Sequence, residues 1–171
     1  MPNQELQRCW ERWLEAHLDA LLLYARSQCS REEDAEDLVQ QALAESWRHG
    51  EPSLPLVFTI IRRRGIDLVR RTSSRQRRES DLCCLNEAWL EPEVESRDCA
   101  AHLARELNKL PSAQREVVLL HVWSGLSFRE IGQVMGTSLH TAASRYRAAL
   151  CALRISLVEL SPFPLRTDAQ P

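Results

Sequence analysis

Several features that would point to a membrane protein or an enzyme are missing from this sequence. No apolar run approaches the roughly 18 residues of a membrane-spanning helix; the longest candidates lie around residues 21–23 and 117–122. None of the 5 glycines belongs to a glycine-rich loop that could hold a nucleotide. The five histidines are isolated, and no Ser-His-acid combination is present. The sequence therefore predicts a protein that is not an enzyme, uses no cofactor and does not insert into a membrane.

Lysine is almost absent, because Lys109 is the only lysine among the 22 basic residues. Codon bias in a GC-rich genome would explain this, and so would selection for arginine, which binds phosphates more specifically.

The first residues lack the basic, apolar and small-residue pattern of a signal peptide. We therefore expect a cytoplasmic protein, monomeric when free.

The 6 cysteines are scattered over different segments. A reducing compartment would leave them as free thiols. The adjacent Cys83 and Cys84, with Cys99 and His102, could offer three thiolates and an imidazole to zinc, but their spacing matches no standard zinc finger. We expect no metal site, with metal binding or redox sensing by these four residues as the open alternative.

Charge is segregated along the chain. The net charge of −2 and the pI near 6.2 exclude a protein that is basic as a whole. Residues 62–78 nevertheless contain arginines at positions 62, 63, 64, 70, 71, 75, 77 and 78, and residues 79–98 contain acids at 79, 81, 87, 91, 93, 95 and 98. A local basic patch can bind phosphates even when the mean charge is negative. At 171 residues, the chain is predicted to form two small domains joined by an acidic linker.

A helix-turn-helix pattern spans residues 126–141. Ser127 and Glu130 form a capping box, which predicts that a helix begins there. Gly136 fits the left-handed conformation that ends many helices, and Thr137 or Ser138 can cap the next helix. Two helices across such a short turn are typical of DNA binding.

The second helix of this motif has two different faces. Its apolar stripe, expected to face the core, consists of Leu139, Ala142, Tyr146, Ala149 and Leu153. The opposite face carries His140, Thr141, Ser144, Arg145 and Arg147. Short polar groups followed by guanidinium groups suit a helix that lies in a major groove. The alternative is a three-helix core whose polar face is merely solvated.

The first half predicts three more helices. One runs from about residue 4 to 28, and a second opens at a capping box of Ser30 and Glu33 and ends near Gly50. The second helix has an inner face of Ala35, Leu38, Val39, Ala42, Ser46 and Trp47. Its outer face is acidic and polar, which solvation and the positive helix N-terminus would also explain.

The third helix of the first half is basic. It follows Pro55, and its arginines surround an apolar stripe of Val57, Ile60, Ile61, Leu68 and Val69. Later segments predict helices at about 99–110 and 113–123. The fold class is therefore all-α, with two helical domains.

Taken together, these segments resemble an extracytoplasmic-function sigma factor, the smallest form of the sigma-70 family, over nearly the whole chain. Residues 34–41 resemble region 2.2, which docks on the clamp helices of the largest RNA polymerase subunit. Residues 58–71 resemble regions 2.3 and 2.4, which melt and read the minus-10 element. Residues 110–117 and the helix-turn-helix resemble region 4, which reads the minus-35 element. The implied division is region 2 at 1–78, an acidic linker at 79–98, region 4 at 99–156 and a tail at 157–171.

The resemblance implies three sets of contact residues and their partners. Core polymerase would bind Asp34, Glu36, Asp37, Gln40 and Gln41. Minus-10 DNA would bind Phe58, Arg62, Arg63, Arg64, Asp67, Arg70 and Arg71, with an unstacked base received near Phe58 and Ile60. Minus-35 DNA would bind His140, Thr141, Ala143, Ser144, Arg145 and Arg147. The implied partners are core RNA polymerase and promoter DNA, with an anti-sigma factor left open.

Two other functions stay open: a helix-turn-helix regulator that acts without docking on polymerase, and a helical adaptor protein.

The chain also departs from the family, having Leu56 for a frequent tryptophan, Arg63 for a frequent asparagine, Gln41 for a common glutamate and Ala143 for a common lysine. The departures at Gln41 and Ala143 predict weaker individual contacts, through one carboxylate and one phosphate contact fewer. The acidic linker is expected to imitate nucleic acid inside the polymerase and, in the free protein, to fold back over the basic segments.

Overall fold

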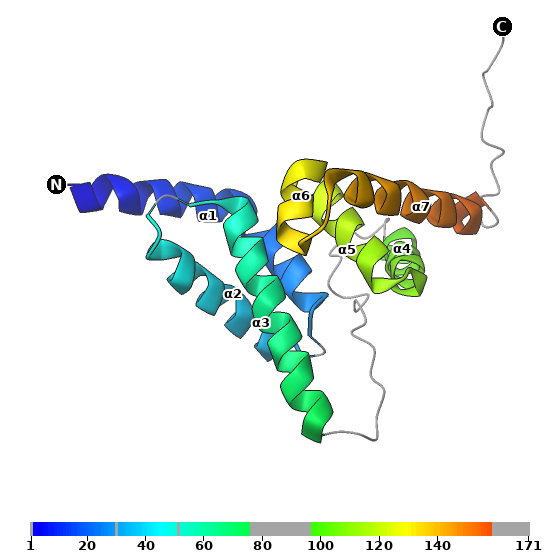
Figure 1. Ribbon diagram of the computed structural model, residues 1–171, viewed down its shortest axis with the longest axis horizontal. Helices are drawn as coiled ribbons and strands as arrows, with labels where there is room; N and C mark the ends of the chain where they lie inside the picture. Colours follow the sequence, from blue (N-terminus) through cyan, green and yellow to red (C-terminus); the bar gives the residue numbers. More distant parts are fainter. Residues whose placement is uncertain (1, 30, 51, 76–96, 159–171) are drawn as a thin grey trace, which may run out of the picture.

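The computed structural model describes residues 2–29, 31–50, 52–75 and 97–158, with side chains described for 4–29, 31–50, 52–71 and 101–156. Within these ranges the chain forms α-helices and one π-helical turn without any strand, which confirms the all-α class (Figure 1). None of the described helices is long and apolar enough to cross a membrane. Most of the expected acidic linker and tail, with Ser30, Cys83 and Cys84, lies outside the described residues.

The helices agree closely with those expected from the sequence. In chain order they are α1 (Pro2–Arg26), α2 (Glu32–Trp47), α3 (Leu54–Arg75), α4 (Arg97–Lys109), α5 (Ser112–Val118), the π-helical turn η3 (Leu119–Trp123), α6 (Phe128–Met135) and α7 (Leu139–Val158).

The first three helices pack against one another. The expected inner face of α2 is confirmed for Ala35, Leu38, Val39, Ala42 and Ser46. Trp47 was wrongly assigned to it, because its side chain is 40% exposed and lies against the edge of the bundle, on Trp10. The N-cap of α2 is Arg31, which makes no side-chain capping bond and pairs with Glu33. The expected capping box of Ser30 and Glu33 depends on Ser30, which lies outside the described residues.

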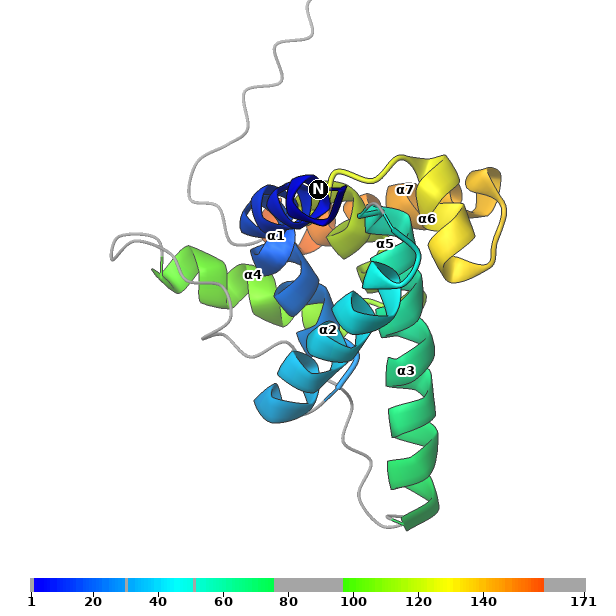
Figure 2. The same ribbon diagram turned by 90° about the vertical axis from the view of Figure 1, so that its left-hand side faces the viewer.

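Helix α3 crosses α1 closely and then projects past the other helices (Figure 2). Val57, Ile60 and Ile61 are buried as expected, but Val69 is 48% exposed. A Cβ added to Gly65 would lie only 2.8 Å from Cβ of Gln28, two residues beyond the end of α1. The glycine therefore permits a close approach of α3 to the turn that follows α1.

The helix-turn-helix forms as the sequence predicts. The backbone N–H of Ser127 donates to Glu130 Oε2 at 2.8 Å, and the N–H of Glu130 donates to Ser127 Oγ. Gly136 ends α6 with φ 64° and ψ 38°, and Ser138 Oγ accepts from the N–H of Thr141 at 3.1 Å at the start of α7. The apolar stripe of α7 is confirmed at Ala142, Ala149 and Leu153, which are buried. Leu139 is 41% exposed because it precedes the part of α7 that packs on its neighbours, so its assignment to the core was wrong.

The two halves of the chain share one hydrophobic core. Helix α3 packs against α6, and α1 contacts η3. Buried side chains from both halves form a continuous cluster that includes Leu21 and Ile61 from the first half and Val117 and Ile131 from the second. The described part of the chain is therefore in a closed arrangement, with the helix-turn-helix seated on α3 (Figure 1).

Candidate nucleic-acid interface

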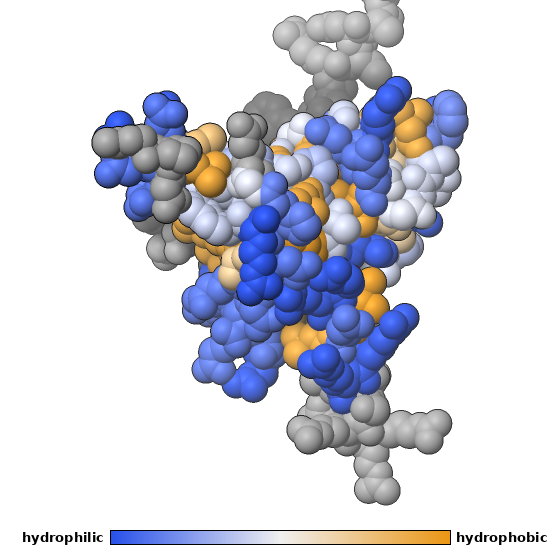
Figure 3. Space-filling view, turned by 60° about the vertical axis from the view of Figure 1, so that its left-hand side comes forward, coloured by the Kyte–Doolittle hydropathy of each residue, from blue (hydrophilic) through white to orange (hydrophobic). Residues whose placement is uncertain are grey.

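The outer face of α2 is accessible along most of its length. Glu36, Asp37, Gln40 and Gln41 are exposed, and Asp34 is half-buried. Three acids in the first turn lie where the positive end of the helix dipole stabilises them. Figure 3 shows that the surface over α2 and α3 is predominantly hydrophilic, interrupted by small hydrophobic patches.

Two of the arginines expected to bind DNA are held by α2. Arg63 Nη2 donates to Glu45 Oε1 at 2.6 Å, and Arg64 Nη2 donates to Glu45 Oε2 at 2.7 Å. Arg64 Nη1 also donates to Gln41 Oε1 at 2.7 Å. Hydrogen bonds from Arg64 and Arg63 hold the pKa of Glu45 below its usual value. These contacts join the helix expected to dock on polymerase to the helix expected to read DNA.

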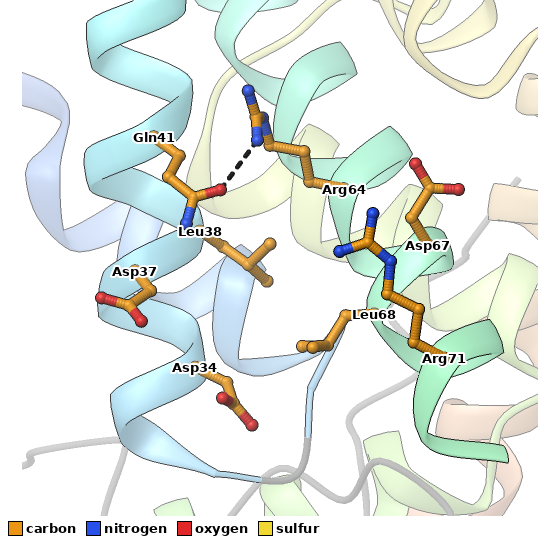
Figure 4. A pocket seen from close by; sticks show the side chains of 8 residues that line it. All are labelled: Asp34, Asp37, Leu38, Gln41, Arg64, Asp67, Leu68 and Arg71. Atoms are coloured by element: carbon orange, nitrogen blue, oxygen red, sulfur yellow. Dashed lines mark hydrogen bonds between the residues drawn. The ribbon is translucent and has the colours of Figure 1, made fainter. Parts of the chain in front are cut away.

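A groove of about 170 Å³ separates α2 from α3 just below these bonds. Figure 4 shows the Gln41–Arg64 hydrogen bond at one end, with two acids of α2 along one wall and Arg71 on the other. The lining residues are Asp34, Asp37, Leu38, Gln41, Arg64, Asp67, Leu68 and Arg71. The groove thus brings together members of two predicted contact sets.

Arg62 points to the other side, toward the second half of the chain. Its Nε donates to Glu116 Oε1 at 2.9 Å, and Tyr24 Oη donates to the same oxygen at 2.5 Å. Burial and the neighbouring Glu116 carboxylate raise the pKa of Tyr24 well above its ordinary value. Sequence reasoning missed Tyr24 and Glu116, since no local pattern links residues 92 positions apart. A second cavity, of about 370 Å³, adjoins this contact and is lined in part by Arg62, Arg70 and Arg115.

Phe58 and Ile60 do not have the surroundings expected of a base-binding site. Phe58 is 0% exposed and packs edge-on against Tyr24, with ring centroids 5.0 Å apart, and Ile60 is buried as well. A ring without exposed surface cannot stack on a DNA base. The expectation for Phe58 was therefore wrong for this structure, because Phe58 is buried in the core with Val57 and Ile61.

The N-terminal half of α7 presents the third predicted set. His140, Ser144 and Arg147 are exposed, whereas Thr141, Ala143 and Arg145 are half-buried. Beneath them, His121 Nδ1 donates a 2.8 Å hydrogen bond to the carbonyl oxygen of Leu126, and the ring stacks on Phe128. The base of the motif is thus fixed by packing, and its polar end is left accessible.

The structure does not describe all of the residues of the alternative metal or redox site, which are Cys83, Cys84, Cys99 and His102. Among the described residues, Cys9, Cys29 and Cys151 form no disulfide bond. Within the residues whose side chains are described, no group of three or more His, Cys, Asp or Glu side chains is placed to hold a metal ion. His102 lies near Glu106, with 3.9 Å between Nε2 and Oε1, but Cys83, Cys84 and the side chain of Cys99 are outside the described set.

Comparison with known proteins gives matches in both halves. Residues 13–75 match Sigma-70 region 2, and residues 101–153 match Sigma-70, region 4. The chain is 30% identical over 152 residues to the RNA polymerase sigma-E factor of Streptomyces coelicolor, covering 87% of this chain and 86% of that protein. It is 34% identical over 131 residues to the ECF RNA polymerase sigma factor RpoE of Cereibacter sphaeroides, covering 70% of each.

Two solved structures have a similar fold. RpoE of Bartonella quintana in complex with the anti-sigma factor NepR has a TM-score of 0.67 and 25% identity, covering 87% of this chain and 96% of that one. CnrH in complex with the cytosolic domain of CnrY has a TM-score of 0.62 and 25% identity, covering 91% of both chains. Since both halves match in order and the relatives align over most of their length, the chain belongs to the extracytoplasmic-function sigma factors of the sigma-70 family.

Proposed function

We propose that this sigma factor directs core RNA polymerase to promoters through three surfaces, acting in the cytoplasm and without a catalytic step of its own. Helix α2 docks on polymerase, α3 binds the minus-10 element, and the N-terminal half of α7 reads the minus-35 element. We assign residues 1–78 to region 2, 79–98 to the linker, 99–156 to region 4 and 157–171 to the tail. The matches to region 2 and region 4 lie inside these bounds.

The observation that carries the docking proposal is the polarity of α2. Its apolar side is buried among the first three helices, while Asp37, Gln40 and Gln41 stay exposed on the other side. A regulator that binds DNA without polymerase is disfavoured, because it has no need of such a face and because residues 13–75 match a region found in sigma factors.

The DNA-binding proposals rest on charge and position. Arginines on α3 supply phosphate contacts, which give affinity without sequence preference. On α7, the exposed His140 and Ser144 lie near the helix N-terminus, where a recognition helix reaches base edges. Arg145 and Arg147 follow one turn later and can reach bases or phosphates.

The closed arrangement cannot read both elements at once. Minus-10 and minus-35 elements are separated by about 25 base pairs, or about 85 Å at about 3.4 Å per pair. Here α3 packs on α6 and α6 packs on α7, so α3 and α7 lie within about two interhelical distances, roughly 20 Å. We infer that the closed form is the resting state and that polymerase separates the halves. The two similar structures were solved with an anti-sigma factor and with CnrY, and a partner of that kind would hold this chain closed.

The docking surface can be tested with the variant Asp37→Arg/Gln40→Ala. We expect weaker assembly with core polymerase, measured by fluorescence anisotropy of labelled sigma factor, with helicity unchanged by circular dichroism. The matched control is Asp19→Arg/Gln4→Ala, which makes the same charge change at exposed positions of α1. Polymerase binding that is equal in the variant and the wild type would reject α2 as the docking helix.

A further inference from the structure

We propose that Glu45 is an internal substitute for promoter phosphates. In the free protein it holds Arg63 and Arg64, and with Gln41 it ties these arginines to the helix that docks on polymerase. The inference rests on the proposed function of α2 and α3. It adds a residue outside the predicted contact sets and a link between polymerase docking and DNA binding.

The geometry shows one carboxylate shared by two guanidinium groups. Each oxygen of Glu45 accepts from a different arginine, at 2.6 Å from Arg63 and 2.7 Å from Arg64. Gln41, one helical turn earlier on α2, accepts a third bond from Arg64 at 2.7 Å. All three bonds direct the donors of α3 toward α2. Glu45 itself is only partly accessible, with 23% of its side chain exposed.

A carboxylate and a phosphate compete for the same donors. Both are oxyanions that accept charge-assisted hydrogen bonds from guanidinium groups, and both are bound well by arginine. Two arginines with Glu45 carry a net charge of +1, whereas the same arginines without it would carry +2. A phosphate that approaches must therefore displace Glu45 and overcome its negative charge. With Glu45 in place, the two arginines of the free protein therefore bind about one phosphate fewer than they would without it.

Gln41 connects this exchange to polymerase. It belongs to the proposed docking set, and it lines the same groove as Asp37 and Arg64 (Figure 4). A polymerase group that binds Gln41 removes one of the three bonds, so Arg64 is held by Glu45 alone. Docking would thus weaken the hold of α2 on Arg64 and make this arginine easier for a phosphate to capture.

The test compares Glu45→Gln with Glu15→Gln, a matched charge change at an exposed position of α1. The probe is a fluorescein-labelled single-stranded oligonucleotide of mixed sequence, titrated at several salt concentrations with the free full-length protein. We expect Glu45→Gln to bind about threefold or more tightly, with a salt slope steeper by about 0.7, as for one more phosphate contact. Equal binding by Glu45→Gln and Glu15→Gln would overturn the proposal.

Two further measurements separate this inference from the proposed function. The gain from Glu45→Gln must vanish in the Arg63→Ala/Arg64→Ala background; a gain that persists there means that Glu45 acts elsewhere and overturns the inference. If Arg63→Ala/Arg64→Ala with Glu45 intact loses binding to the oligonucleotide, α3 is supported as a DNA-binding helix, whatever the effect of Glu45→Gln. If that variant keeps its binding, both the inference about Glu45 and the assignment of α3 as a DNA-binding helix are overturned. With holoenzyme, the advantage of Glu45→Gln should fall below twofold. An undiminished advantage would refute the link to polymerase.

Discussion

The contact between Tyr24, Arg62 and Glu116 predicts how the closed form can be opened. Glu116 Oε1 accepts from Tyr24 Oη at 2.5 Å and from Arg62 Nε at 2.9 Å, and it lies where the two halves of the chain meet. Glu116→Ala removes both bonds. It leaves the hydroxyl of a fully buried tyrosine without a partner and leaves Arg62, whose side chain is 30% exposed, without its counter-ion.

The expected effect is the sum of two unequal terms. A buried hydroxyl without a partner costs about 1–3 kcal/mol. Loss of the counter-ion of Arg62 costs at most about 1 kcal/mol, because solvent screens a partly exposed pair. The closed arrangement should therefore weaken by about 1–4 kcal/mol, which changes the ratio of closed to open protein by roughly 5-fold to 900-fold.

Small-angle X-ray scattering and hydrogen exchange would measure this opening. We expect a larger radius of gyration and faster exchange in α6, which packs on α3 in the closed form. Adding Tyr24→Phe to Glu116→Ala removes the unpaired hydroxyl and should recover about 1–3 kcal/mol of closure. Glu11→Ala, an exposed substitution on α1, controls for loss of a carboxylate. If Glu116→Ala leaves scattering and α6 exchange unchanged, the reasoning about this contact is wrong.

Three further predictions follow from single groups. Burial raises the pKa of Tyr24, so its contribution to stability is complete below about pH 10 and is lost as pH rises toward the folded-state value; Tyr24→Phe should remove this alkaline loss in thermal unfolding. Glu130→Ala should cost about 1 kcal/mol at pH 7. Because bonds from Ser127 lower the pKa of Glu130, that cost should shrink as pH falls below about 4, and a pH-independent cost would contradict the capping role. On promoter duplexes, Arg147→Ala should reduce the salt slope by about 0.9 for every sequence, whereas Arg145→Ala should cost about 1–3 kcal/mol on the cognate minus-35 element alone; equal losses on all duplexes would remove Arg145 from base recognition.

Local sequence rules determined the helix-turn-helix. The capping box at Ser127, the left-handed Gly136 and the cap at Ser138 involve residues within a few positions of one another, so a short stretch of sequence contains all the information. The same holds for the apolar side of α2. The family resemblance added the order of the two regions, because its motifs are also continuous segments.

Only the tertiary structure decided which faces are covered and which charges meet. Periodicity marks an apolar stripe, but it does not say where the neighbouring helix ends, so Val69 lies exposed and Phe58 lies in the core. The sequence pattern did not show that α3 lies beside α2 at Glu45, where Arg63 and Arg64 bind this carboxylate. Glu116 meets Tyr24 across 92 positions, and such pairing depends on the packing of whole helices, which no local segment of the sequence specifies.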